Sequence, residues 1–302
     1  MNVATFTGVY PILVTPFDEQ ARIDEESLRR LVEFCLVAGV HGLGIALGSE
    51  IYKLSEAERV RVTRIVVDQV KGRVPVVVNT SAAGADLATL YSRLAEENGA
   101  NALMVSPPSF APPTPQDVVR YFQMIDAAVS LPIFMQDTAG TPISADVARQ
   151  IAGSCEHVRW IKVESPPTPL KVAEAATQGA GLLTVFGGAG GNNLLEELRR
   201  GARGTMPGCS QPEAFVAVWN HWHSGRRAAA RALMDRVVAP VNRLAAMGWG
   251  AFYTVHKEIL RQRGVIRTAV VRCPAGPPLD ATSQEELAEI ITLLNEESER
   301  LS

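Results

Sequence analysis

The feature that most constrains the fold is a regular alternation of short apolar segments with longer amphipathic segments over residues 1–224. Short, uninterrupted apolar runs predict strands of a parallel sheet covered on both faces, and apolar spacings of three and four predict helices. The predicted strands are residues 9–14, 41–47, 74–79, 102–105, 132–136, 157–163, 182–186 and 204–206. The predicted helices are residues 24–38, 55–70, 86–98, 115–129, 144–152, 169–178, 192–200 and 212–222.

Eight strand–helix repeats in about 220 residues are typical of a closed (β/α)8 barrel. A doubly wound sheet is the alternative, but no GxGxxG motif follows the first predicted strand. After residue 224 the pattern becomes purely helical, with predicted helices at 226–247, 252–264 and 283–301. We therefore expect a barrel over residues 1–224 and a helical extension, packed on the barrel, over residues 225–302.

Composition excludes several classes of partner. The chain has 302 residues, of which 47% are hydrophobic and 20% charged, as expected of a globular protein. The net charge of −3 and the absence of a basic stripe argue against nucleic acid as a partner. No signal-peptide pattern or membrane-length apolar run is present, so we expect a cytoplasmic protein with no membrane partner. The four cysteines lack CxxC spacing, which favours reduced thiols over a metal site or a disulfide framework.

The segment HVRWIKVES, residues 157–165, carries the strongest chemical signal. Side chains alternate along a strand, so Lys162 and Glu164 share one face, and Ile161 and Val163 share the other. Burial disfavours an ammonium and yields the neutral amine that attacks carbonyl carbons. A structural Lys162–Glu164 ion pair is the alternative. In a barrel, however, functional residues gather at the carboxyl ends of the strands, where Lys162 lies.

Several further motifs extend this signal along the chain: the opening GVYPILVTPF, then LGSEIYKLSEAER, IKVES and GARGTMPGCSQPE, and the helical C-terminus. With them the sequence resembles the dihydrodipicolinate synthase / N-acetylneuraminate lyase superfamily of class I aldolase barrels. The resemblance implies that a lysine on strand six forms a Schiff base with a 2-oxo acid such as pyruvate, and Lys162 matches that position. It also implies a small-molecule 2-oxo acid substrate. Because the imine serves as the electron sink, no cofactor or metal is expected.

The departures from the family pattern indicate a branch. The usual GTTGE turn reads ALGSE at residues 46–50, and the usual Tyr-Asn pair after strand five is Gln136-Asp137. An amide does not titrate, so Gln136 cannot replace a tyrosine as a proton shuttle. The loop after strand four also lacks the second aromatic hydroxyl of the synthases. The pattern resembles the L-2-keto-3-deoxyarabonate dehydratases, within the dehydratases of 2-keto-3-deoxy sugar acids.

We therefore predict a Schiff-base lyase that cleaves a carbon–oxygen bond in preference to a carbon–carbon bond. Two alternatives remain open. One is a retro-aldol lyase or synthase that uses pyruvate, and the other is a non-catalytic barrel that binds a 2-oxo acid.

Six residues form the predicted site. Lys162 is the nucleophile, and Glu164 is the candidate base at C3 of the substrate or, alternatively, only the charge partner of the lysine. The backbone of Gly48 and Ser49, with the Ser49 hydroxyl, is expected to hold the substrate carboxylate, although Gly48 can instead serve turn geometry alone. Gln136 either binds a substrate hydroxyl or carboxylate or fills the inner barrel layer.

The sixth residue is Gly208, which is expected at the barrel mouth, where it allows close approach of a ligand. For assembly, Trp219, Trp222 and the C-terminal helices offer more apolar surface than one barrel requires. The related family is usually tetrameric. We therefore expect a homo-oligomer, either a dimer or a tetramer.

Overall fold

The structure is a computed structural model that describes residues 6–248 and 250–301. The chain packs as two compact units. The first combines the segment ending at Tyr10 with Pro75–Met206. The second combines Pro11–Val74 with the chain from Pro207 onward. No helix among the described residues is long and apolar enough to cross a membrane.

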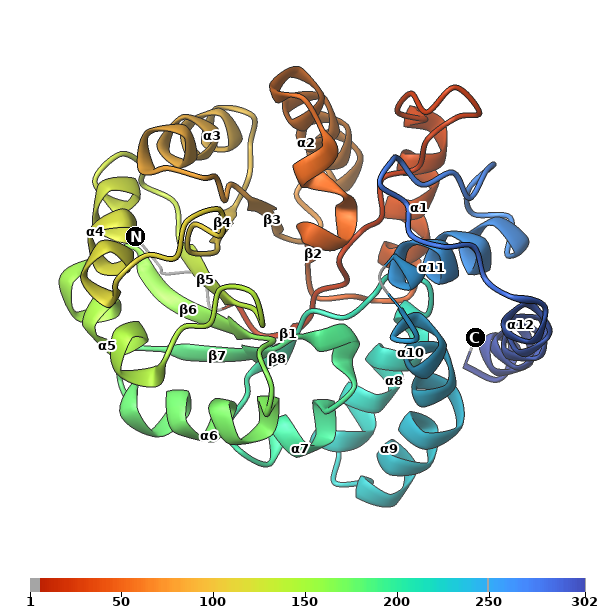
Figure 1. Cartoon of the computed structure of the whole chain (residues 1–302). Coiled ribbons are helices and arrows are strands. Elements are labelled where there is room, and N and C mark those ends of the chain that lie inside the picture. The colour runs from red at the N-terminus through yellow and green to blue at the C-terminus, as the bar shows by residue number, and fades with distance from the viewer. Residues whose placement is uncertain (1–5, 249, 302) are drawn as a thin grey trace. The chain divides into compact units, whose positions relative to one another are not determined.

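The first unit contains most of the strands (Figure 1). They are β1 (Gly8–Val9), β3 (Val76–Asn79), β4 (Ala102–Val105), β5 (Ile133–Asp137), β6 (Val158–Val163), β7 (Thr184–Gly187) and β8 (Gly204–Thr205). All pair in parallel, in the order β1-β8-β7-β6-β5-β4-β3. The helices between them are α3 (Ala85–Glu97), α4 (Pro115–Asp126), α5 (Ala145–Ser154), α6 (Thr168–Gln178) and α7 (Leu194–Leu198), with the 3₁₀ turn η3 (Ala189–Gly191).

An aromatic cluster fills the interior of the first unit. Trp160 of β6 stacks on Phe134 of β5, with ring centroids 5.6 Å apart. Phe6 meets the Trp160 ring edge-on at 5.3 Å. Phe186 of β7 bridges Phe134 and Tyr10 at 5.4 and 5.5 Å. These rings come from strands far apart in sequence, and their packing fixes which face of each strand points inward.

The second unit holds the remaining elements. They are α1 (Glu25–Val37), β2 (Leu43–Ile45), η1 (Leu47–Ser49), η2 (Ile51–Lys53), α2 (Glu56–Val70), α8 (Pro212–His223), α9 (Arg227–Leu233), the π turn η4 (Met234–Val238), α10 (Ala239–Ala245), α11 (Ala251–Gln262) and α12 (Ala281–Leu301). Ile12 forms parallel bridges to both Gly44 of β2 and Gly208. One backbone position thus pairs on two sides, which is the arrangement that a closed barrel requires.

Helix starts follow the local sequence. Ser55 caps α2, where its hydroxyl accepts from the Glu58 N–H and the Glu58 carboxylate accepts from the Ser55 N–H. This is a capping box, the motif that a serine three residues before a glutamate favours at the start of a helix. Thr114 and Asp117 form the same motif at α4. Each box pairs backbone donors that the first helical turn leaves open.

Several predicted elements have different bounds in the structure. The strands expected at 9–14 and 41–47 are shorter, as β1 and β2. Pro11 has no N–H to continue the first ladder, and the chain after β2 turns into η1. The helix expected at 226–247 is divided by η4. Pro240 cannot donate to the carbonyl of Arg236, and the helix widens to a π turn in this region.

Helices α9–α12 confirm the helical character of the C-terminal region. The domain boundary expected between residues 224 and 225 stays a prediction.

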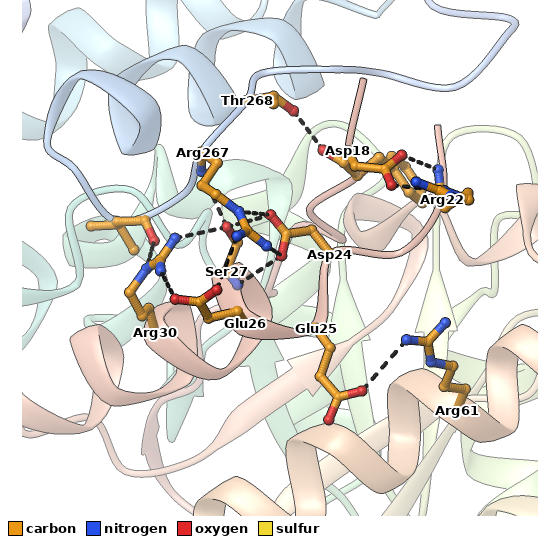
Figure 2. A network of polar contacts seen from close by, with 12 residues as sticks. Asp18, Arg22, Asp24, Glu25, Glu26, Ser27, Arg30, Arg61, Arg267 and Thr268 are labelled. Atoms are coloured by element: carbon orange, nitrogen blue, oxygen red, sulfur yellow. Dashed lines mark hydrogen bonds and ion pairs between the residues drawn. The ribbon is translucent and has the colours of Figure 1, made fainter. Parts of the chain in front are cut away.

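A polar network ties the segment after α11 to the start of α1 (Figure 2). Asp24 caps α1 and accepts from the N–H and hydroxyl of Ser27. The guanidinium of Arg267 donates to both oxygens of Asp24, at 2.8 and 2.5 Å, and to Glu26 at 2.9 Å. Arg267 holds the pKa of Asp24 at about 2, below its usual value of 3.8. The network therefore anchors a C-terminal segment on a helix N-terminus more than 200 residues earlier.

Candidate active site

Lys162 lies near the carboxyl end of β6 and is almost completely buried, with 3% of its side chain exposed. In the strand register it stands between Gln136 of β5 and Phe186 of β7. Trp160, two positions earlier on the same face, belongs to the aromatic cluster of the interior. The inward orientation predicted from strand alternation thus agrees with the packing. The aromatic cluster thus provides apolar surface on the interior side of Lys162, and polar residues such as Gln136 lie beside it at the strand ends.

Glu164 is the immediate partner of this lysine. Its Oε1 lies 3.0 Å from the Lys162 Nζ and also accepts from the backbone N–H of Ala189 at 3.1 Å. Its Oε2 accepts from the amide of Gln136 at 2.7 Å. The side chain is 20% exposed, so the carboxylate is oriented by donors without being sealed from solvent. The ion pair and a catalytic role are therefore compatible.

Two glycines at the end of β7, Gly187 and Gly188, make room for two carboxyl groups. A Cβ on Gly188 would lie 2.2 Å from the Glu164 Cγ, closer than any real contact. A Cβ on Gly187 would lie 1.8 Å from the Glu197 Oε2. Burial, together with the nearby charges of Glu196 and Glu164, raises the pKa of Glu197 from 4.5 to about 7. Glu197 is thus a second buried carboxyl group, and it is close enough to Glu164 for the charge of Glu164 to raise its pKa.

Gln136 is embedded in a chain of amides. Its Oε1 accepts from the Nδ2 of Asn79 at 2.9 Å, and its Nε2 donates to Glu164. Asn79, the last residue of β3, accepts from the backbone N–H of Ser81 at 3.1 Å. The sequence analysis did not single out Asn79. The sequence does carry a signal for it: Asn79 is a polar residue at the carboxyl end of an otherwise apolar strand, where the functional residues of a barrel lie.

A second polar cluster lies where β5 and β6 end. Asp137 is fully buried and accepts from the Ser165 hydroxyl and from Lys171 of α6, each at 2.6 Å. It also accepts from the N–H of Ile143 at 2.8 Å. Its carbonyl accepts from the N–H of Glu164 at 2.9 Å. Asp137 therefore fixes the backbone that carries Glu164, a role that the sequence analysis did not predict.

In the second unit, the Ser49 hydroxyl is already engaged. It donates to the carbonyl of Leu13 and accepts from the N–H of Ala46 at 3.0 Å. Gly48 is closely packed, since a Cβ there would lie 2.9 Å from the Phe252 ring and 3.1 Å from Ile12. The Ser49 hydroxyl thus stabilises the turn. Binding of a substrate carboxylate by Gly48 and Ser49 stays a prediction.

Gly208 accommodates a histidine of the C-terminal region. A Cβ on Gly208 would lie 2.3 Å from the His256 ring, so glycine is required for this packing. The Nδ1 of His256 shares a hydrogen bond with the Ser210 hydroxyl at 2.7 Å. Burial lowers the pKa of His256 to about 4, which keeps the imidazole neutral. A ligand-binding role for Gly208 stays a prediction.

The Ser49 turn is also tied to helix α11. Glu50, next to Ser49, has a left-handed backbone with φ of 56° and a fully buried side chain. It pairs with Lys257 of α11 and with Lys53, whose Nζ lies 2.8 Å away. Burial lowers the pKa of Lys257, and the Glu50 charge opposes that shift. Among residues 6–248 and 250–301, no group of three His, Cys, Asp or Glu is placed to hold a metal ion.

Known proteins resemble this chain in sequence and in fold. Residues 5–294 match the Dihydrodipicolinate synthetase family. The chain belongs to this family. It is 29% identical over 296 residues to an L-2-keto-3-deoxyarabonate dehydratase of Azospirillum brasilense, covering 95% of this chain and 94% of the relative. It is 30% identical over 236 residues to a 4-hydroxy-tetrahydrodipicolinate synthase of Pseudomonas aeruginosa, covering 76% and 80%.

A solved structure shows the same fold over nearly the whole chain. The crystal structure of a dihydrodipicolinate synthase from Rhodopseudomonas palustris superimposes with a TM-score of 0.87 at 28% identity, covering 95% of this chain and 97% of that chain. The predicted fold class, a (β/α)8 barrel with C-terminal helices, is confirmed. The protein is a lyase of the dihydrodipicolinate synthetase family, whose members act on small molecules.

Proposed function

We propose that the protein is a Schiff-base-forming dehydratase of a 2-keto-3-deoxy sugar acid. The observation that carries this proposal is the buried Lys162 paired with Glu164, beside an amide where a tyrosine hydroxyl would serve a synthase. The dehydratase relative, aligned over 95% of the chain, favours the same reaction class. The substrate is a small 2-oxo acid, and neither a metal nor an organic cofactor takes part.

The reaction begins at the amine of Lys162. Its nitrogen attacks C2 of the substrate, and loss of water from the carbinolamine leaves a protonated imine. The imine draws electrons from C3, so Glu164 removes a proton there and the C–H electron pair forms the C2=C3 bond of an enamine. The enamine electrons then expel the hydroxyl of C4, which leaves as water with the proton that Glu164 took from C3, and hydrolysis of the remaining imine frees Lys162.

The surroundings of Lys162 suit this sequence of steps. The aromatic cluster beneath the amine provides apolar surface, which disfavours a lone ammonium and promotes attack by the neutral amine. Glu164 is near enough to hold the ammonium before reaction and is partly exposed toward an incoming substrate. Gln136 cannot exchange protons, so Glu164 is the titratable group available at 3.0 Å from the reacting nitrogen.

A pyruvate-dependent aldolase or synthase is the second candidate. The relative from Pseudomonas aeruginosa is a synthase, and imine formation is common to both reactions. The two differ in whether the enamine loses the C4 hydroxyl or arises by cleavage of the C3–C4 bond. A panel of 2-keto-3-deoxy acids separates them, because the dehydratase yields a semialdehyde and the aldolase releases pyruvate.

The decisive experiment is borohydride reduction in the presence of pyruvate. We expect a covalent adduct on the peptide containing Lys162, located by mass spectrometry. Lys162→Ala is expected to abolish both adduct and turnover while circular dichroism shows a folded protein. Lys71→Ala, which alters an exposed lysine at the end of α2, is the control. Reversible pyruvate binding without an adduct in the wild type would support a non-catalytic binding protein instead.

A further inference from the structure

Three side chains form an unbroken hydrogen-bonded chain across the ends of β3, β5 and β6. Asn79 donates to Gln136 at 2.9 Å, and Gln136 donates to Glu164 at 2.7 Å. Asn79 and Gln136 are both almost completely buried. Gln136 therefore uses both ends of its amide within the protein, and its expected role as a substrate contact or as a filler of the inner barrel layer stays a prediction.

The direction of this chain is set by a group that cannot be reversed. The backbone N–H of Ser81 can only donate, and it points at Asn79 at 3.1 Å. Asn79 must present its carbonyl oxygen there, which turns its NH₂ toward Gln136. Gln136 must then present its own oxygen to Asn79 and its NH₂ to Glu164. Reversing any one amide would place two donors or two acceptors face to face.

Glu164, the last member of the chain, therefore always accepts a hydrogen bond from the NH₂ group of Gln136. Glu164 accepts from Gln136 on one oxygen and from the N–H of Ala189 on the other, beside the ammonium of Lys162. Hydrogen bonds from donors favour an ionised carboxylate, whereas a facing acceptor would favour the protonated acid. The orientation of Asn79 thus determines whether Gln136 presents a donor or an acceptor to Glu164.

We propose that Asn79 is a positioning residue that locks the Gln136 amide in the orientation that keeps Glu164 a proton acceptor. The inference rests on the proposed function, in which Glu164 removes the C3 proton of the lysine imine. It adds a specific task for a residue that touches neither the lysine nor the imine. Asn79 acts through Gln136, and Gln136 acts through its hydrogen bond to the base.

Asn79→Asp tests the direction of the chain. The new carboxylate still accepts from Ser81 but has no NH₂ to offer, so Gln136 turns its own NH₂ toward the new carboxylate. The oxygen of Gln136 then faces Glu164, and the base is held in its protonated form. Asn101→Asp is the matched control. Asn101 also accepts from a backbone N–H, that of Val76 at 2.8 Å, but at the opposite end of β3.

The probe is pyruvate, whose methyl protons exchange with D₂O when a base removes the C3 proton of its imine. Exchange is followed by ¹H NMR, and imine formation by borohydride trapping. For Asn79→Asp we expect undiminished trapping, exchange slowed about 10-fold or more, and the midpoint of its pH profile moved to higher pH. Asn101→Asp should match the wild type. If borohydride traps no pyruvate adduct in the wild-type protein, the proposed function itself is refuted, independently of the role of Asn79.

Gln136→Met removes the hydrogen-bond donor to Glu164 and keeps a side chain of similar volume. It provides a second test of the inference in case Asn79→Asp does not fold. We expect it to retain trapping and to slow exchange by a comparable factor. Wild-type exchange rates and pH midpoints in both folded variants would overturn the inference. So would a parallel fall in trapping and exchange with no change in the pH midpoint, because that pattern marks general structural damage at the site.

Discussion

At the residue scale, Glu164 is fixed in position by several contacts at once. It balances the ammonium of Lys162, accepts two further hydrogen bonds and keeps part of its surface exposed. Gly188 is what allows it to be there, since any larger residue would overlap its side chain. A purely structural partner for the lysine would not need to be oriented by three groups, which here are Lys162, Gln136 and the N–H of Ala189. The arrangement instead suits a carboxylate that must act at one defined atom.

Glu164→Gln is expected to retain the borohydride-trappable imine and to lose turnover by about 10²–10⁴-fold, the usual contribution of a general base. The amide keeps the shape of the side chain but cannot take the C3 proton. Turnover is measured with the 2-keto-3-deoxy acid panel, and Glu156→Gln, at an exposed position just before β6, is the control. A wild-type rate would make Glu164 only structural. Loss of trapping would mean that it prepares Lys162 for attack.

Glu197 is the residue whose titration should be most visible in stability. Its pKa is raised from 4.5 to about 7 by burial, so the folded state binds more protons than the unfolded state between these pH values. Stability from this group is therefore present below pH 4.5 and is lost as pH rises through 7.

We expect Glu197→Gln to be more stable than the wild type by about 1–3 kcal/mol at pH 8 and nearly equal to it at pH 4.5. Urea unfolding at both pH values measures the difference. Glu174→Gln, which changes an exposed carboxyl on α6, should show no such pH-dependent gain. A gain for Glu197→Gln that is the same at both pH values would contradict the assignment.

At the scale of elements, the segment after α11 is held by charges and not by a sheet or helix of its own. Arg267 binds the cap of α1, and Arg272 forms a bidentate pair with Glu58 of α2 at 2.6 and 2.9 Å. Lys53 donates to the carbonyls of Arg272 and Pro274, each at 2.8 Å. Helix starts in the N-terminal region are thereby coupled to the C-terminal segment.

Arg267→Met is expected to lower the free energy of unfolding at neutral pH, because it leaves the buried carboxylate of Asp24 without its main partner. Asp24 is 2% exposed at its side chain, whereas Arg22, paired with Asp18 in the same view, is 72% exposed (Figure 2). Arg22→Met should therefore change the free energy of unfolding much less than Arg267→Met. Thermal or urea unfolding distinguishes the two.

The same pair predicts a response to acid. The folded pKa of Asp24 is about 2 against 3.8 ordinarily, so its contribution is present above pH 3.8 and lost as pH falls toward 2. Arg267→Met should flatten the stability profile in this range. An unchanged acid slope would show that Arg267 is not the main cause of the shift.

At the scale of the whole molecule, we propose a homo-oligomer, either a dimer or a tetramer. Trp222 offers little support, since it is largely buried within its own chain and stacks on Arg227 at 3.4 Å. Other apolar side chains remain uncovered, above all Phe110, which is 93% exposed in the loop after β4. Aromatic residues are enriched in protein–protein interfaces.

Light scattering at micromolar concentration should give a mass of two or four chains of 32.5 kDa. Because the loop after β4 offers no aromatic hydroxyl, we expect assembly to matter for stability more than for chemistry. Dilution should then lower the unfolding temperature before it lowers activity. A monomeric mass would refute the expected assembly.

The sequence by itself determined the alternation of strands and helices, the cap of α2 and the shared face of Lys162 and Glu164. These follow from local rules: an apolar period, a serine three residues before a glutamate, and the two-residue repeat of a strand. The family assignment rested on short contiguous motifs and is confirmed.

Only the tertiary structure decided which polar groups meet. Asn79 and Gln136 are 57 residues apart, and Gln136 and Glu164 are 28 apart. Their contacts depend on the register of neighbouring strands and on how each side chain satisfies its hydrogen bonds. The Ser49 hydroxyl illustrates the same limit, because it is taken by the backbone of Leu13, 36 residues away. A sequence specifies donors and acceptors, but packing in three dimensions decides their partners, because a buried polar group must find one wherever the fold provides it.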